Sequence, residues 1–102
     1  MSKRHEITAV ISDKRGRVLS VGQNSYIKTH PLMAYHSHKV GQPYRQYIHA
    51  EVHAITKCLD LRKAHKISVF RYNALGQPVL AKPCAVCQSA ILAAGIKEVE
   101  HT

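Results

Sequence analysis

The sequence has no apolar run that approaches the roughly 18 residues of a membrane-spanning helix. Its first residues, Met1-Ser2-Lys3-Arg4-His5-Glu6, carry positive charge but no apolar stretch that could serve as a signal peptide. The sequence also has no internal repeat and no low-complexity segment. These absences exclude the usual signals for membrane insertion and export, and they predict a cytoplasmic protein.

Cysteine is scarce, with three residues in the chain. An odd number fits poorly with a disulfide framework. Cys84 and Cys87 form a C-x-x-C pair, which in a reducing compartment indicates metal or redox chemistry. Cys58 lies alone in an apolar helical pattern and is interpreted as a core residue, because free cysteine packs as a small hydrophobe.

Acidic residues are few as well. Six Asp and Glu stand against fifteen Lys and Arg, which gives a formal net charge of +9. This excess predicts anionic partners such as nucleotides or nucleic acid, although basic surfaces without a target are the alternative. Arg45, Arg71 and Lys82 are candidates for phosphate contact, because Lys and Arg complement phosphate oxygens. For each of them a solvated surface charge is the competing interpretation.

The length of 102 residues predicts a single domain over 1–102. The apolar share of 45% is ordinary for a globular protein and argues against disorder. A domain this short buries a modest fraction of its surface, so a metal or a partner subunit is expected to add stability.

Alternation and turn residues predict the strands of this domain. A pair of strands at 6–12 and 17–22 should form an antiparallel hairpin around a turn at Gly16. Two further strands are expected at 67–72 and 96–100. The segment from Gln23 to Tyr47 has no regular pattern except for a short helix, which should open at Pro31 and close before Gly41.

Two longer helices are predicted around these strands. The first carries an apolar stripe and fades near 62–63, and its stripe consists of Ile48, Val52, Ile55 and Leu59. The second runs from about Cys84 to Ala94 and is stopped by Gly95. The order of elements predicts an α/β fold whose later strands are joined through crossover helices.

The chemistry-bearing residues open these two helices. Cys84 and Cys87 are three residues apart at a helix start, so their sulfurs should face the same way, and the helix N-terminus favours a thiolate. With His49 they supply three zinc ligands, whereas a structural zinc usually takes four. Three ligands leave a position for water, and Glu51, two residues after His49, could move the proton of that water as a general acid and base.

These motifs resemble the cytidine and deoxycytidylate deaminase superfamily. His49-Ala50-Glu51 followed by Pro83-Cys84-Ala85-Val86-Cys87 matches the H-x-E and P-C-x-x-C signature of zinc deaminases. The resemblance covers most of the chain, including the hairpin, Gly22-Gln23-Asn24 and the tail from Gly95 to Val99. The second helix looks most like those of small phage-type deoxycytidylate deaminases, which would place the protein in a host cytoplasm.

The resemblance implies a fold and a set of roles. The fold is a cytidine deaminase-like three-layer sandwich with helices packed on a mixed central sheet, in a minimal version without the first helix and the last strand. The zinc ion is bound by His49, Cys84 and Cys87, and Glu51 is the proton shuttle. Asn24 contacts the sugar or base, and Ala50, Pro83 and His53 are further expected substrate contacts, with the carbonyl of Pro83 and the backbone N–H of Cys84 helping to hold the base.

Several alternatives stay open for the histidines. His53, four residues after His49, could be a ligand, a substrate contact, or a structural or surface residue. The family commonly has Asn at this place, so the histidine is a departure. His30, His36 and His38 could bind a second metal or touch substrate, although each alone is better interpreted as a surface residue.

The expected reaction is hydrolysis of a cytosine nucleotide, with deoxycytidine monophosphate as the first candidate, to the uracil nucleotide and ammonia. One alternative is a deaminase of cytosine or adenine within single-stranded DNA or RNA. Another is a non-catalytic, zinc-stabilised nucleic-acid-binding module. Because a minimal version would leave a sheet face or edge uncovered, a homo-oligomer is also expected.

Overall fold

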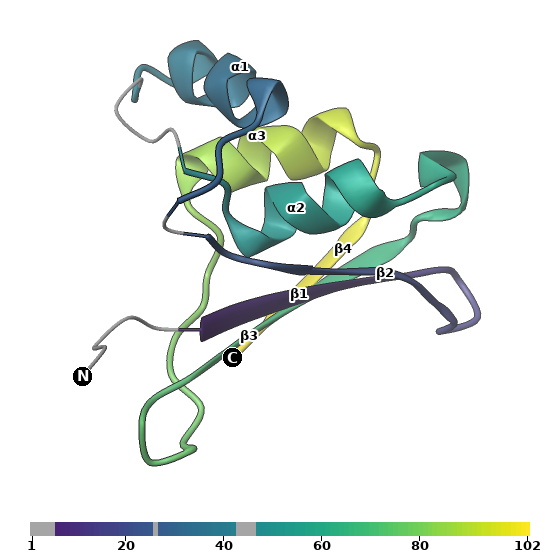
Figure 1. Cartoon of the computed structure of the whole chain (residues 1–102). Coiled ribbons are helices and arrows are strands. Elements are labelled where there is room, and N and C mark those ends of the chain that lie inside the picture. Colours follow the sequence, from purple (N-terminus) through teal and green to yellow (C-terminus); the bar gives the residue numbers. More distant parts are fainter. Residues whose placement is uncertain (1–5, 26, 43–46) are drawn as a thin grey trace.

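The protein consists of one sheet with its helices on a single side (Figure 1). The computed structural model describes residues 6–25, 27–42 and 47–102. The strands are β1 (Glu6–Ser12), β2 (Val18–Gln23), β3 (Lys66–Tyr72) and β4 (Glu98–His101). They lie in the order β2-β1-β3-β4; β1 is antiparallel to β2 and β3, and β3 is parallel to β4. The predicted mixed sheet is confirmed.

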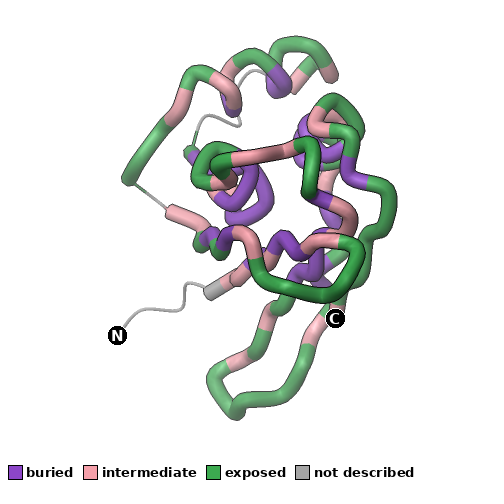
Figure 2. The backbone as a smooth tube through the Cα atoms, turned by 90° about the vertical axis from the view of Figure 1, so that its right-hand side faces the viewer, coloured by how far each residue is buried: buried purple, intermediate pink, exposed green. Residues whose placement is uncertain are grey.

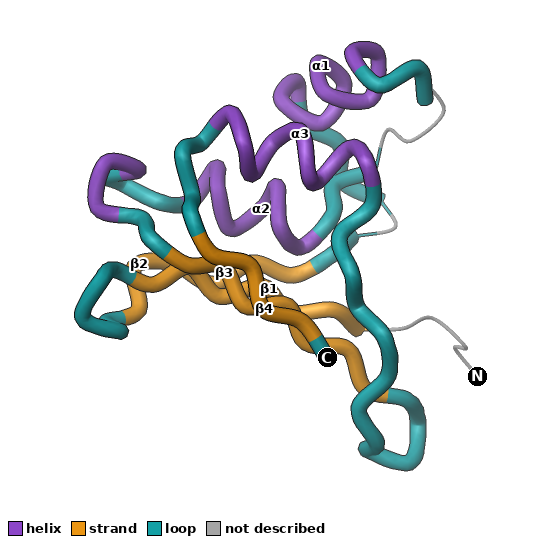
Figure 3. Tube along the Cα trace, turned by 180° about the vertical axis from the view of Figure 1, so that it is seen from behind, coloured by secondary structure: helices purple, strands orange, loops and turns teal. Residues whose placement is uncertain are grey.

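Three helices and one short 3-10 turn cover this sheet. They are α1 (Pro31–Lys39), α2 (Ala50–Lys57), the 3-10 turn η1 (Leu61–Lys63) and α3 (Ala85–Ala93). The helix α2 packs on β1 and β2, α3 lies beside α2, and α1 packs against α3. Figures 1 and 3 show all three helices on the same side of the sheet. The helices therefore form two layers on one face of the sheet, α2 with α3 and then α1, and no described helix lies on the other face.

The core lies between the helices and the sheet, where Figure 2 shows the buried residues gathered. Alternate positions of the central strands point toward the helices, so Ala9, Ile11 and Ile67 are fully buried there. The α2 residues Val52 and Ile55 cover them, as the predicted stripe requires. The predicted core role of Cys58 is met in part, because this residue packs against the core but is only half-buried.

The predicted extent of α2 was wrong at its end. The helix stops at Lys57, and Cys58 already has the extended ψ of 118°. Asp60 then accepts a hydrogen bond from the backbone N–H of Arg62 and opens η1. Leu59 consequently lies outside the helix and is fully exposed, so it is not part of the buried stripe.

The contact between β2 and α2 is unusually close at Gly22. A Cβ placed on this glycine would lie 2.3 Å from the backbone nitrogen of Ala54 and 2.4 Å from the carbonyl oxygen of Ala50. Nearby, Ser20 Oγ donates to the Ala54 carbonyl at 2.8 Å. The absence of a side chain at position 22 therefore sets how closely the helix that carries Glu51 can approach the sheet.

Gly22→Ala is expected to destabilise the protein by about 3 kcal/mol, because backbone atoms of α2 must move to admit the methyl group. Urea denaturation measures this change in the free energy of unfolding. Val21→Ala is the matched control, since Val21 is the neighbouring residue and faces away from the helices, and it should cost about 1 kcal/mol or less. Equal stabilities of the two variants would contradict the close approach.

The opposite face of the sheet carries apolar side chains in contact with solvent. Val21, Phe70 and Tyr72 are all partly exposed there. The strand β4 pairs only with β3 within the described residues, and its four residues are exposed. The expectation of an uncovered face and edge is thus met. A search of the described residues finds no helix long and apolar enough to cross a membrane.

Candidate metal centre

The starts of α2 and α3 bring the three predicted ligands together. His49 and Cys84 are the residues that immediately precede these helices, and both have extended backbone conformations. Neither side chain is used to cap its own helix. Cys87 lies in the first turn of α3, on the same face as Cys84. Packing of α2 beside α3 therefore directs one imidazole and two thiols toward a common point.

The spacing of the three donor atoms fits a tetrahedral zinc ion. His49 Nδ1 lies 3.2 Å from Cys87 Sγ and 3.6 Å from Cys84 Sγ. All three donor atoms lie within 4.8 Å of one another. Zn–N and Zn–S bonds of about 2.0 and 2.3 Å at tetrahedral angles would separate nitrogen and sulfur by about 3.5 Å. Among the described residues, this is the group of His, Cys, Asp and Glu side chains with a metal-binding arrangement.

The pKa values of the two thiols are shifted in opposite directions, and this pattern suits metal binding. A hydrogen bond from Cys87, together with the nearby His49, lowers the pKa of Cys84 to about 3, although burial opposes this shift. The pKa of Cys87 is raised, first by its hydrogen bond to Cys84 and then by its own burial. Cys84 thus loses its proton readily. The positive charge of a bound dication would favour deprotonation of Cys87 as well.

Glu51 occupies the second position of α2, beside the donor group. Its side chain is 5% exposed. Burial raises the pKa of this carboxyl, while its own backbone N–H and the nearby His49 lower it. The Cys87 thiol also acts on the Glu51 carboxyl through a hydrogen bond. A buried carboxyl that has a raised pKa and lies beside three metal ligands is suited to accept and return a proton.

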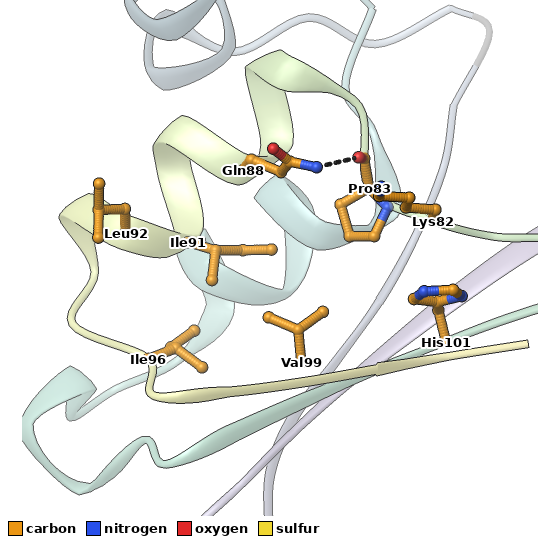
Figure 4. A pocket seen from close by; sticks show the side chains of 8 residues that line it. All are labelled: Lys82, Pro83, Gln88, Ile91, Leu92, Ile96, Val99 and His101. Atoms are coloured by element: carbon orange, nitrogen blue, oxygen red, sulfur yellow. Dashed lines mark hydrogen bonds between the residues drawn. The ribbon is translucent and has the colours of Figure 1, made fainter.

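The structure gives the places of three of the expected substrate contacts. Asn24 follows β2, and its Oδ1 accepts a hydrogen bond from the backbone N–H of Ile7 at 3.0 Å. Ala50 is fully buried between His49 and Glu51. Pro83 is buried, and its carbonyl accepts a hydrogen bond from Gln88 Nε2 at 2.9 Å (Figure 4). That carbonyl keeps a second lone pair for a ligand.

His53 is not part of the metal-binding group. It lies one turn after His49 on α2, and its Nδ1 is 3.0 Å from the backbone nitrogen of Gln23. The ring lines a hollow beside the start of α2 instead. The interpretation of His53 as a zinc ligand is therefore not supported, while the substrate-contact and structural interpretations both remain consistent with its place.

The other histidines take separate positions. His30 Nδ1 accepts from the backbone N–H of Leu32 and caps α1. His36 is buried, contrary to the expectation of a surface residue, because its Nδ1 meets Ser89 Oγ at 2.9 Å where α1 packs on α3. Burial lowers the pKa of His36. His38 is exposed, and none of the three joins a metal-binding group among the described residues.

Sequence reasoning did not single out Lys28, and it named His30 only as one of three histidines that could bind a second metal or touch substrate. Lys28 and His30 line the same hollow as Asn24 and His53. They come from the irregular segment, where no periodicity indicates which side chains converge. Of the predicted phosphate contacts, Arg71 and Lys82 do not line this hollow, and Arg45 lies outside the described residues.

A larger hollow of about 460 Å³ lies between α3 and β4 (Figure 4). Its floor is apolar and consists of Ile91, Ile96 and Val99. Neither Glu51 nor any of the three metal ligands lines it. Lys82 and Pro83, one of the expected substrate contacts, also line it.

Comparison with known proteins agrees with this geometry. The family model for the cytidine and deoxycytidylate deaminase zinc-binding region matches residues 1–101. No curated protein matches the chain in a sequence search. The donor group His49, Cys84 and Cys87 and the family together identify the metal as Zn²⁺. With nearly the whole chain covered, the protein belongs to the cytidine and deoxycytidylate deaminase family of zinc-binding domains.

Proposed function

We propose that the protein is a zinc-dependent hydrolytic deaminase that converts deoxycytidine monophosphate (dCMP) to deoxyuridine monophosphate and ammonia. The observation that carries this proposal is the buried Glu51 carboxyl beside the three-ligand group of His49, Cys84 and Cys87. A purely structural zinc site would need a fourth ligand and would have no use for a protonatable side chain. The non-catalytic zinc module is therefore the weaker alternative.

The roles of the residues follow from their places. The zinc ion, when bound, supplies a Lewis acid that makes water acidic enough to react near neutral pH. Water adds to C4 of the cytosine ring, and the C4 amino group leaves as ammonia. The two protons of that water end on ring N3 and on the leaving amine. Glu51 takes a proton from the water and returns it, so the same carboxyl acts first as base and then as acid. His49, Cys84 and Cys87 fix the place of the reaction.

The distribution of charge supports a phosphate-bearing substrate. The carboxylates of Asp13, Asp60, Glu98 and Glu100 lie at the opposite end of the sheet or on β4, and each has a cationic or histidine neighbour within 3.4 Å. Near the helix starts, Lys28 and Lys82 have no described carboxylate within ion-pair distance. An excess of positive charge beside the centre attracts anionic substrates.

A panel of substrates tests the proposal. The zinc-loaded protein would be given cytidine, deoxycytidine, their monophosphates, and single-stranded oligonucleotides that contain cytosine or adenine, and ammonia release would be measured. Release mainly from dCMP, with a shallow dependence on salt, is the expected result. Release from an oligonucleotide alone, falling steeply with salt as many phosphates are neutralised, would replace dCMP by a polymer substrate.

The proposal includes a homo-oligomer. Two features support association of copies of the chain. Val21, Phe70 and Tyr72 are exposed on the open face of the sheet, and among the described residues the outer edge of β4 has no partner strand. Light scattering coupled to size-exclusion chromatography at micromolar concentration should give a mass of at least twice 11.4 kDa. A monomer mass throughout this range would contradict association.

A further inference from the structure

The described residues that line the hollow beside the start of α2 offer hydrogen-bond donors and include no carboxylate. It has a volume of about 360 Å³. Lys28, His30 and His53 line it, together with the hydroxyl-bearing Ser25, Thr29 and Thr56. A cavity lined by an ammonium group, imidazoles and hydroxyls suits an anion rather than a cation.

Both imidazoles in this hollow are oriented by backbone hydrogen bonds. The N–H of Leu32 donates to His30 Nδ1 at 3.0 Å, and the N–H of Gln23 donates to His53 Nδ1 at 3.0 Å. A neutral ring that accepts at Nδ1 carries its proton at Nε2. His53 Nδ1 also lies 3.1 Å from the Gln23 carbonyl, to which it would donate in the other tautomer. His30 thus keeps an Nε2–H donor for a ligand, and His53 keeps one when its Nδ1 accepts from Gln23.

The hollow is connected by the backbone to the metal centre. Ile48, which precedes the ligand His49, accepts from the backbone N–H of Ser25 at 3.0 Å and donates to the carbonyl of Lys28 at 2.9 Å. Lys28 is fixed further, because its N–H donates to Ser25 Oγ at 2.9 Å. His53 follows His49 by one turn, and its N–H donates to the His49 carbonyl. Residues that line the hollow are therefore neighbours of the ligand His49 along the chain and through backbone hydrogen bonds.

We propose that this hollow binds the phosphate of the substrate as a monoester dianion, held by the Lys28 ammonium and the Nε2–H groups of His30 and His53. This assignment rests on the proposed function, because it assumes that a cytosine nucleotide places its base at the metal centre. Lys28 is then a specificity-determining residue that separates nucleotide from nucleoside. A phosphate monoester offers several acceptor oxygens and nearly two charges, which matches an array of donors better than a sugar hydroxyl does.

Lys28→Gln tests the assignment, with Lys97→Gln as its matched control. Both lysines are exposed and both variants lose one positive charge, but Lys97 lies next to β4, at the opposite end of the sheet. The measured quantity is the ratio of kcat/KM for dCMP to kcat/KM for deoxycytidine. Lys28→Gln should lower this ratio about 30-fold, as expected for loss of a charge-assisted hydrogen bond, and Lys97→Gln should leave it within about twofold.

A binding measurement separates this assignment from the reaction. Inorganic phosphate is titrated into zinc-loaded protein while the histidine ring nitrogens are followed by ¹⁵N NMR. The Nε2–H tautomer and phosphate-dependent shifts at His30 and His53 are expected, and Lys28→Gln should weaken the response. Shifts without deamination of any substrate would contradict the proposed function but support the phosphate site.

Three outcomes would overturn the phosphate site itself. The first is that His30 and His53 do not respond to phosphate. The second is that Lys28→Gln and Lys97→Gln lower the ratio of kcat/KM for dCMP to kcat/KM for deoxycytidine equally. The preference for dCMP would then depend on the net charge of the protein and not on Lys28. The third is turnover of cytosine only within an oligonucleotide, with Lys28→Gln reducing the salt slope of its binding, which would assign a phosphodiester to the hollow in place of a monoester.

Discussion

Glu51→Gln is expected to lower kcat for dCMP deamination by about 10³-fold or more while zinc remains bound. Glutamine has nearly the same shape as glutamate but cannot take a proton from water or return one to the leaving amine. The protein should also stay folded, because the buried carboxyl already has a raised pKa and its charge is disfavoured in this environment. Initial rates, zinc content by atomic absorption and the Tm would be measured on the same sample.

Asp60→Asn is the control for this change. It also converts a carboxylate to an amide, but Asp60 lies beyond α2, at the opposite end of the sheet, where it pairs with Arg62. Its kcat should stay within about twofold of the original protein. Retention of a tenth or more of the activity in Glu51→Gln, with full zinc content, would remove Glu51 from the proton transfer.

Cys87→Ser is expected to weaken zinc affinity by about 100-fold or more and to abolish activity. Serine has a similar size, but its hydroxyl does not give the soft anionic ligand that a thiolate gives. Cys87 is fully buried at the start of α3, so loss of the metal should also remove the zinc-dependent part of the stability. A competition titration with a zinc chelator and Tm values with and without zinc measure both effects.

Cys58→Ser provides the comparison, because Cys58 is a free, half-buried cysteine outside the donor group. It should bind zinc as the original protein does, and its Tm should rise on zinc addition by the same amount. Equal zinc loss in the two variants would mean that the donor group does not form the metal site.

The metal-binding group could be predicted because its determinants are local. Cys84 and Cys87 are three residues apart at a helix start, and His49 and Glu51 lie within one turn, so their mutual placement depends on little beyond helix geometry. What the sequence did not contain was the distance between the two helix starts. That distance comes from the packing of α2 and α3, for which Gly22 and its close contact with Ala50 and Ala54 are one determinant.

The end of α2 shows why periodicity is an incomplete guide. Leu59 continues the spacing of Ile48, Val52 and Ile55, yet it is fully exposed. The spacing depends only on which residues are apolar. Asp60 accepts a hydrogen bond from the backbone N–H of Arg62, and this bond starts a new turn. A local side-chain hydrogen bond therefore ended a helix that the apolar pattern would have continued.

The hollow beside the centre could not be predicted for a related reason. Lys28 and His30 belong to a segment without regular structure, and their positions depend on backbone hydrogen bonds to Ile48 and Leu32. Arg71 and Lys82 were chosen as phosphate contacts by charge alone, and charge does not indicate which cavity a side chain lines.

The most direct test of hydrolytic deamination is to follow dCMP with the zinc-loaded protein in H₂¹⁸O by mass spectrometry. The account predicts deoxyuridine monophosphate that carries one oxygen from solvent at C4, formed together with one equivalent of ammonia. Unchanged dCMP in the presence of stoichiometric zinc, or a product without solvent oxygen, would contradict it.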